Sequence, residues 1–553
     1  MRAGELAWAR AEDAAPIARL LTPESNEEAV LERKWWTLIA VSIAIFMLLL
    51  DITVVNVALP DIQRSLHSSF QDLQWVVDAY SLTLAAFLLT AGSLADRLGR
   101  RRVFTAGLVV FTASSVVCGL SSSPLMLNLA RGVQGVGGAM MFATSLALIA
   151  QAFEGRERGT AFGVFGAVTG AAVAVGPLVG GIITSAIGWE WIFFVNLPIG
   201  VCAVILTVMR VQESRDPNAA RVDWIGLVTF SGSLFLLVFA LVRGNDAGWG
   251  STQIVAMLAA SVVLIVLFLV AELAQERPML DLSLFRRPAF VGANAVAFTI
   301  SASIFSMFLY LTLYIQDVLG YSPLQAGLRF LPITLLSFIV APFAGRLTVR
   351  VPVRLLLGTG LALVGAGLFS MTAVDATTSW TALIPGFILA GAGIGLVNPP
   401  LASAAIGVVP ATRSGMASGI NSTFRQVGIA TGIAGLGAIF QHSVTQHTTA
   451  SLARSGHAGE IVSAAHGQLG TLLQSGEVAA VAKTVHPAAF AALTSAYRVG
   501  FTDALTTILI IAGLVALAGS ALAFALVRSR DFVASHERAS SPQETDAAAV
   551  PAA

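Results

Sequence analysis

Long apolar runs, separated by short polar segments, recur along the whole chain. A helix rises about 1.5 Å per residue, so about 20 apolar residues are enough to cross a bilayer. The runs that meet this length are 36–59, 73–94, 103–121, 125–150, 160–186, 190–210, 223–243, 252–272, 289–316, 323–347, 354–374, 381–406, 415–440 and 502–527. The pattern predicts an all-α polytopic membrane protein with 14 transmembrane helices. An even number of spans places both termini on one side of the membrane.

Basic residues are concentrated in alternate loops. The basic set consists of Arg33, Lys34, Arg97, Arg100, Arg101, Arg102, Arg156, Arg158, Arg210, Arg215, Arg221, Arg277, Arg286, Arg287, Arg346, Arg350, Arg354, Arg413, Arg528 and Arg530. The opposite short loops carry little more than Arg64 and Arg243. Because cytoplasmic loops are enriched in Lys and Arg, we expect both termini to be cytoplasmic.

Composition supports this class. The 553 residues are 56% hydrophobic and only 11% charged, with a mean hydropathy of +0.80, whereas soluble domains are about a quarter charged. The net charge of +1 gives no indication of nucleic-acid binding. The two cysteines, Cys118 and Cys202, lie inside apolar runs, so we expect them to be buried apolar side chains rather than partners in a disulfide. The polar segments 1–34 and 531–553 are predicted to be disordered cytoplasmic tails, with no signal peptide at the start.

Glycines repeat along the chain at an offset of 256 residues. The matches are Gly135 with Gly391, Gly137 with Gly393, Gly159 with Gly415, Gly163 with Gly419 and Gly176 with Gly432. They predict two related six-helix bundles in parallel orientation, at 35–210 and 281–530, with two helices inserted at 211–280. A long external loop, 441–500, interrupts the second bundle. Parallel repeats that enclose a site at the membrane midplane are a transporter architecture.

Three ionisable residues lie at a similar depth in the external half of three spans. They are Asp51 in the first span, Asp78 in the second and Arg131 in the fourth. Charges inside a bilayer are costly and usually pair, so they mark candidate functional sites. Two acids and one arginine leave a deficit of one positive charge, which a proton or a cationic ligand could supply. The alternative is a static ion pair that locks the bundle.

Further polar residues fall on helix faces that are candidates for a substrate cavity. With Asp51, the predicted lining residues are Asn56, Gln134, Asn421 and Arg425. Arg425 either lines the pathway or bonds backbone carbonyls. At the repeat offset, Phe387 takes the place of Arg131, which favours a functional role for Arg131 over a purely structural one.

Two motifs indicate conformational change. The basic loop between the second and third spans contains Gly92, Asp96, Arg97, Gly99 and Arg100. There, Gly99 permits a tight turn, and Asp96 is placed to meet a helix N-terminus. The fifth span contains Gly176, Pro177, Gly180 and Gly181. Small residues allow close helix contact and proline kinks the span, so we expect a deformable boundary between the two bundles.

No Walker loop, nucleophile elbow or His/Cys metal spacing is present, so we expect no enzyme activity, no cofactor and no metal. The driving force for transport would then be a proton gradient.

Together these motifs resemble the major facilitator superfamily, in particular its fourteen-helix drug:proton antiporters of the EmrB/QacA type. The stretches that carry the resemblance are Leu50–Pro60, Gly92–Arg102, Arg131 with Gly135, and the glycines of the fifth span. Glu190 is a departure, because the family more often has arginine at this position. The resemblance implies a multi-pass transporter. We expect it to lie in the plasma membrane and to function as a monomer. The resemblance also implies export of a small molecule against proton entry by alternating access. Our leading hypothesis is that the cargo is an amphiphilic compound such as an antibiotic, that Asp51 or Asp78 carries the proton, and that Arg131 takes part in the proton coupling. Two alternatives stay open: an importer or facilitator of one metabolite, and a scaffold or sensor without transport.

Overall fold

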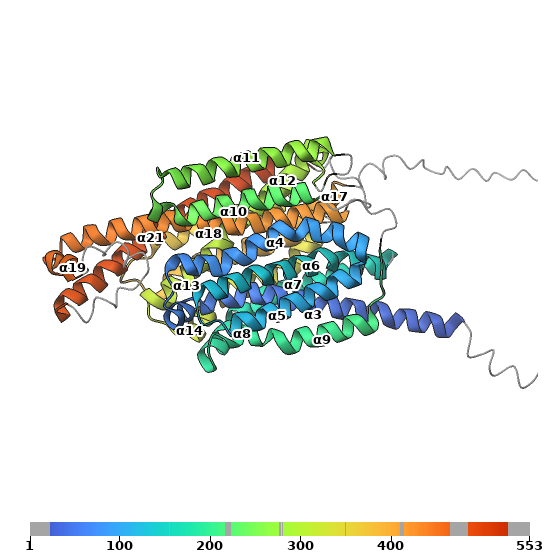
Figure 1. Cartoon of the computed structure of the whole chain (residues 1–553), viewed down its shortest axis with the longest axis horizontal. Helices are drawn as coiled ribbons and strands as arrows, with labels where there is room; N and C mark the ends of the chain where they lie inside the picture. Colours follow the sequence, from blue (N-terminus) through green and yellow to red (C-terminus); the bar gives the residue numbers. More distant parts are fainter. Residues whose placement is uncertain are drawn as a thin grey trace, which may run out of the picture.

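The computed structural model describes residues 23–153, 155–215, 223–275, 278, 280–348, 350–409, 414–464 and 485–528. Within these ranges the chain is built from helices and contains no β-strand (Figure 1). Thirteen helices are long and apolar enough to span a membrane, and a helix pair bent by 41° raises the number to fourteen. The predicted all-α polytopic fold is confirmed.

The first bundle follows the predicted order of spans. Its helices are α3 (Pro23–Leu66), α4 (Phe70–Leu98), α5 (Arg100–Gly119), α6 (Pro124–Ala152), α7 (Gly155–Ala186), and the short α8 (Trp191–Phe194) continued by α9 (Asn196–Arg210). Helix α3 begins at Pro23, so it includes residues 23–34 of the segment 1–34 for which disorder is predicted. These residues are rich in Glu, Ala, Leu, Arg and Lys, which are strong helix formers. Residues 1–22 and 529–553 lie outside the described part of the chain.

The second bundle contains more irregular helices. Its elements are α12 (Pro288–Ile300), a π-helix (Ser301–Phe305), α13 (Ser306–Leu313), a second π-helix (Tyr314–Val318), α14 (Pro323–Arg329), α15 (Leu331–Leu347), α16 (Val353–Ser370), α17 (Ile384–Gly407), α18 (Ser414–Ala453) and α21 (Pro487–Leu526). Elements α12 to the second π-helix form one continuous span, and α14 with α15 is the bent pair.

Close glycine contacts occur at equivalent places in the two bundles. A Cβ atom on Gly137 of α6 would lie 2.9 Å from the carbonyl oxygen of Gly107 of α5. A Cβ atom on Gly393 of α17 would lie 2.4 Å from the carbonyl oxygen of Gly360 of α16. Gly137 and Gly393 are one of the pairs at the 256-residue offset. The repeat therefore preserves the positions where helix backbones touch, as expected for helices that pack in lipid.

The two inserted helices are α10 (Trp224–Ala247) and α11 (Thr252–Ala274), which pack on each other along one side of the molecule (Figure 1). Helix α10 contacts α4 of the first bundle and α18 of the second. Trp75 of α4 packs on Phe235 and Phe239 of α10, with ring centroids 6.1 and 5.8 Å apart. The inserted pair thus covers the boundary between the bundles on this side.

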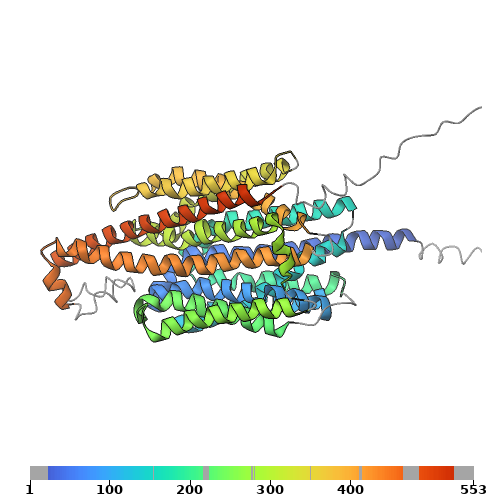
Figure 2. The same cartoon turned by 90° about the horizontal axis from the view of Figure 1, so that it is seen from above.

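Helices α18 and α21 extend beyond the bundles at the end opposite the N-terminal helix (Figure 2). Each has 40 residues, about 60 Å of helix, which is roughly twice the thickness of the hydrocarbon core. The short helix α19 (Ala458–Ala464) packs on the projecting part of α21, around Leu452, Ile461 and Leu493. Most of the predicted external loop 441–500 is therefore helical where it is described; residues 465–484 lie outside the described residues.

Candidate functional site: a buried charge network and a cavity between the bundles

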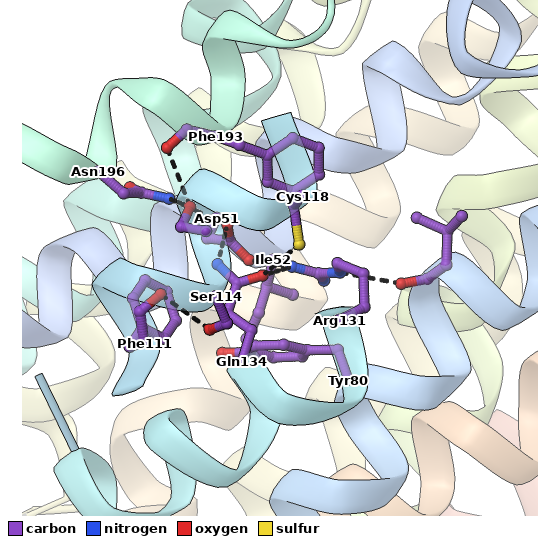
Figure 3. A network of polar contacts seen from close by, with 12 residues as sticks. Asp51, Ile52, Tyr80, Phe111, Ser114, Cys118, Arg131, Gln134, Phe193 and Asn196 are labelled. Atoms are coloured by element: carbon purple, nitrogen blue, oxygen red, sulfur yellow. Dashed lines mark hydrogen bonds and ion pairs between the residues drawn. The ribbon is translucent and has the colours of Figure 1, made fainter. Parts of the chain in front are cut away.

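A buried ion pair joins three helices of the first bundle. Asp51 of α3 is 2% exposed, and its Oδ2 accepts a hydrogen bond of 2.5 Å from Nη1 of Arg131 of α6. Its Oδ1 accepts from Gln134 Nε2 at 2.9 Å and from Asn196 Nδ2 of α9 at 3.1 Å (Figure 3). Both oxygens of the carboxylate are satisfied, which is the condition for keeping a charge inside the membrane.

Arg131 is equally well satisfied. Its Nε donates to the carbonyl oxygen of Val76 at 3.0 Å, and its Nη1 also donates to Gln134 Oε1 at 2.8 Å. The guanidinium lies 4.3 Å from the ring centroid of Tyr80, in cation–π geometry (Figure 3). The predicted proximity of Asp51 and Arg131 is therefore observed. Gln134, predicted to face a cavity, instead lies inside this network, because the ion pair needs its amide as a donor and an acceptor.

Asp78 is not part of the network. Its side chain is fully buried, yet neither carboxylate oxygen has a hydrogen-bond partner among the described residues. Asp78 lies one helical turn from Gln74, which donates to the carbonyl oxygen of Ile433 of α18 at 3.1 Å. The expectation that all three intramembrane charges gather holds for two of them, since Asp78 belongs to the contact between α4 and the second bundle.

A cavity of about 2240 Å³ lies between the bundles. Asn56, Asn421 and Arg425 line it, as predicted from their helix faces, whereas Asp51 does not. The aromatic part of the lining comes from both bundles: Phe142, Phe165, Phe305, Phe308, Phe330 and Phe338. Such a large, mainly apolar cavity with scattered polar groups suits a drug-sized amphiphile.

The cavity extends toward the arginine-rich end of the bundles, where Asp96, Arg100 and Arg286 belong to its lining. At the other end the bundles are in contact. Gln316 Nε2 donates to the carbonyl oxygen of Val57 at 2.7 Å, and the backbone N–H of Leu324 donates to Ser185 Oγ at 2.9 Å. Their hydrophobic cores are also continuous at this end. We call the end of the bundles that carries these contacts and the contact of Gln74 the closed end.

The fifth-span glycines take part in two different contacts. A Cβ atom on Gly176 or Gly180 of α7 would collide with Thr53 or Val54 of α3, inside the first bundle. A Cβ atom on Gly181 would lie 2.6 Å from the carbonyl oxygen of Pro323 of α14, in the second bundle. The backbone carbonyl of Pro177 makes a similarly close approach to Gly327 of α14. The motif therefore lies at the closed end, where α7 meets the second bundle.

The basic loop Gly92–Arg102 is held by a residue that the sequence did not single out. Gly99 has φ of +111°, and Asp96 pairs with Arg100 at 2.8 Å instead of capping a helix. The anion at the N-terminus of α5 is Glu213, which follows α9. Its carboxylate accepts from the backbone N–H of Arg101 at 3.0 Å and of Arg102 at 3.2 Å. Arg97 is exposed.

Two parallel bundles around a cavity that is open toward one end define a membrane transporter of the alternating-access class. The chain belongs to the Major Facilitator Superfamily, whose family model matches residues 41–433. This membership confirms the prediction of a multi-pass transporter rather than an enzyme.

Three individual proteins illustrate the similarity. The multidrug resistance protein Stp of Mycobacterium tuberculosis is 40% identical over 73% of this chain and 75% of its own length. The tetracenomycin C resistance and export protein of Streptomyces glaucescens is 33% identical over 74% of this chain and 77% of its own. The crystal structure of a bacterial homologue of the human lysosomal transporter Spinster matches with a TM-score of 0.56 and 17% identity, covering 90% of this chain and 98% of that one. The last match shows the fold.

Proposed function

We propose that this protein exports small amphiphilic molecules from the cell in exchange for protons. The observation that carries the proposal is the large, mainly apolar cavity between the bundles, open toward the arginine-rich end and closed at the other. Relatives at 33–40% identity over most of the chain are named for multidrug resistance and antibiotic export, which supports the direction of transport.

The orientation in the membrane belongs to the same proposal. The arginine-rich end, and with it both termini, is assigned to the cytoplasm by the positive-inside rule. The state described above is then open to the cytoplasm and ready to take up substrate. We assign the protein to the plasma membrane as a monomer, with a first bundle at 35–210, inserted helices at 211–280 and a second bundle at 281–530.

The two buried acids suit different roles in proton coupling. The carboxylate of Asp51 accepts hydrogen bonds from three donors, one of which is the guanidinium of Arg131. Asp78 is buried without a hydrogen-bond donor among the described residues, so it is the acid whose charge the surrounding side chains do not compensate. Asp78 would take up a proton from the external side, and this uptake would let α4 close against α18. The Asp51–Arg131 pair would hold the bundle through the cycle.

Everted membrane vesicles provide the test, because their lumen corresponds to the external side. We expect vesicles with an acidic lumen to accumulate at least one aromatic dye from a panel of anionic, cationic and neutral dyes. Accumulation should stop with a protonophore, and dye addition should release protons from the lumen. Dye movement only in right-side-out vesicles would identify an importer, and no protein-dependent movement of any dye would refute transport of amphiphiles.

Asp78→Asn tests the coupling site. We expect this variant to lose proton-driven accumulation and to keep dye binding from the cytoplasmic side, because Asn imitates the protonated acid permanently. Asp375→Asn is the matched control. Asp375 lies in an exposed loop, where hydrogen bonds from Thr378 and Thr377 lower its pKa to about 2, so it stays ionised at every working pH. Full accumulation by Asp78→Asn would remove Asp78 from the proton pathway.

A further inference from the structure

Arg425 is a cation of α18 that lines the cavity without an acidic partner. Its Nη2 donates to Asn398 Oδ1 of α17 at 3.0 Å. No carboxylate among the described residues forms an ion pair or a close electrostatic contact with its guanidinium. This differs from Arg131, whose charge is neutralised by Asp51. A guanidinium stays charged in proteins, so Arg425 brings a net positive charge to the cavity wall.

The acids of the membrane interior do not balance this charge. Asp51 and Asp78 are buried in other contacts and lie outside the cavity lining. The acids that do line the cavity come from segments at its arginine-rich end: Asp96, Asp223, Glu272 and Asp281. Asp96 is paired with Arg100, and the other three accept hydrogen bonds from the backbone N–H groups of Gly226, Leu280 and Ser283. Among the described residues, no acid lines the cavity outside these segments.

The surroundings of Arg425 strengthen its attraction for an anion. The cavity lining is mainly apolar and includes six phenylalanines, and a charge interacts more strongly in apolar surroundings than in water. The polar side chains that line the cavity near it on α18 are uncharged: Asn421, Ser422 and Gln426. A ligand with an acidic group could pair with Arg425 on this face of α18.

We propose that the preferred cargo is an aromatic amphiphile with a negative charge, such as a carboxylate, sulfonate or phenolate. The acidic group lies against Arg425 and the rings lie among the phenylalanines. The inference rests on the proposed function in one respect, which is that the bound ligand is transported. The binding preference follows from the cavity itself.

Two dyes with the same tricyclic skeleton and opposite charge test the preference: fluorescein as the anion and rhodamine 123 as the cation. Their binding to the purified full-length protein in detergent is measured by fluorescence anisotropy. We expect Arg425→Gln to weaken fluorescein binding at least tenfold and to leave rhodamine 123 binding unchanged or stronger. Arg425→Lys should keep part of the fluorescein affinity. Arg243→Gln removes the same charge from an exposed site outside the cavity and should change neither affinity.

Opposite effects on the two dyes cannot come from general destabilisation, which would weaken both. Equal fluorescein affinity in wild type and Arg425→Gln, or tighter wild-type binding of rhodamine 123 than of fluorescein, would overturn the inference. The vesicle assay reports on the proposed function separately. Charge-selective binding without proton-driven accumulation would refute export alone, and accumulation of cationic dyes with no Arg425 effect would refute the anion preference alone.

Discussion

The Asp51–Arg131 pair allows a quantitative prediction about stability. Replacing Asp51 with Asn keeps the shape of the side chain and removes its charge. Arg131, which is 1% exposed, would then lack its only ion-pair partner among the described residues. The contact of 2.5 Å between Oδ2 and Nη1 would lose its charge-assisted hydrogen bond, and the Asn amide group could face the guanidinium as a second donor. Breaking a buried pair in this way costs about 3–5 kcal/mol.

A double variant separates the cost of an unpaired charge from the cost of lost contacts. Arg131→Gln alone leaves Asp51 without its cation and should also cost about 3–5 kcal/mol. In Asp51→Asn/Arg131→Gln both charges are absent, so we expect the double variant to be more stable than either single variant. A half-exposed pair provides the control: Glu157→Gln breaks the contact with Lys34 and should cost no more than about 1 kcal/mol.

The measurement is reversible unfolding of the purified protein in mixed micelles with increasing SDS, followed by tryptophan fluorescence. The free energies of unfolding of the wild type and the four variants are compared at one micelle composition. A cost below about 1 kcal/mol for Asp51→Asn, or a double variant whose cost equals the sum of the two singles, would refute the argument. Either result would mean that water molecules or a rearrangement of neighbouring groups compensates the charge of Arg131.

Three further changes test other contacts. Gly181→Val should prevent α7 from closing on Pro323 and lower transport at least tenfold, measured as dye accumulation, whereas Gly163→Val, which meets open space, should keep most of it. Glu213→Ala removes the anion at the N-terminus of α5 and should lower stability by about 1 kcal/mol, less in high salt, as seen in thermal unfolding. Gln74→Leu removes a hydrogen bond of the closed end, so we expect double electron–electron resonance distances to show a larger population that is open at this end.

The number and order of the helices were predictable because the bilayer fixes the length of an apolar run. The ends of α18 and α21 were not, because the length criterion stops at the membrane boundary, while the helices continue into water. The start of α3 was missed for the same reason, since residues 23–34 are polar but are good helix formers. The π-helices at 301–305 and 314–318 leave no trace in a hydropathy pattern.

Residues of the candidate site could be predicted where a residue is energetically costly to place in a membrane span. A charge in an apolar run requires compensation, which pointed to Asp51, Arg131 and Arg425. Their partners were harder to find, because Asn196 is 145 residues from Asp51, and Glu213 is more than 110 residues from the helix start that it contacts. An amide at the start of an apolar span was the only signal for Asn196. The isolation of Asp78 could not be predicted, since it depends on how α4 meets α18.

The projecting parts of α18 and α21 have a mechanical consequence. Both helices are continuous from the second bundle to their projecting tips, so a tilt of that bundle becomes a sideways swing of the tips. Over about 30 Å of projecting helix, a tilt of roughly 10° moves the tip by about 5 Å. The projecting parts of α18 and α21 therefore move together with the second bundle. A fluorophore at the projecting tip, such as at Ser455, would report each turnover at a distance from the cargo that leaves the cavity undisturbed.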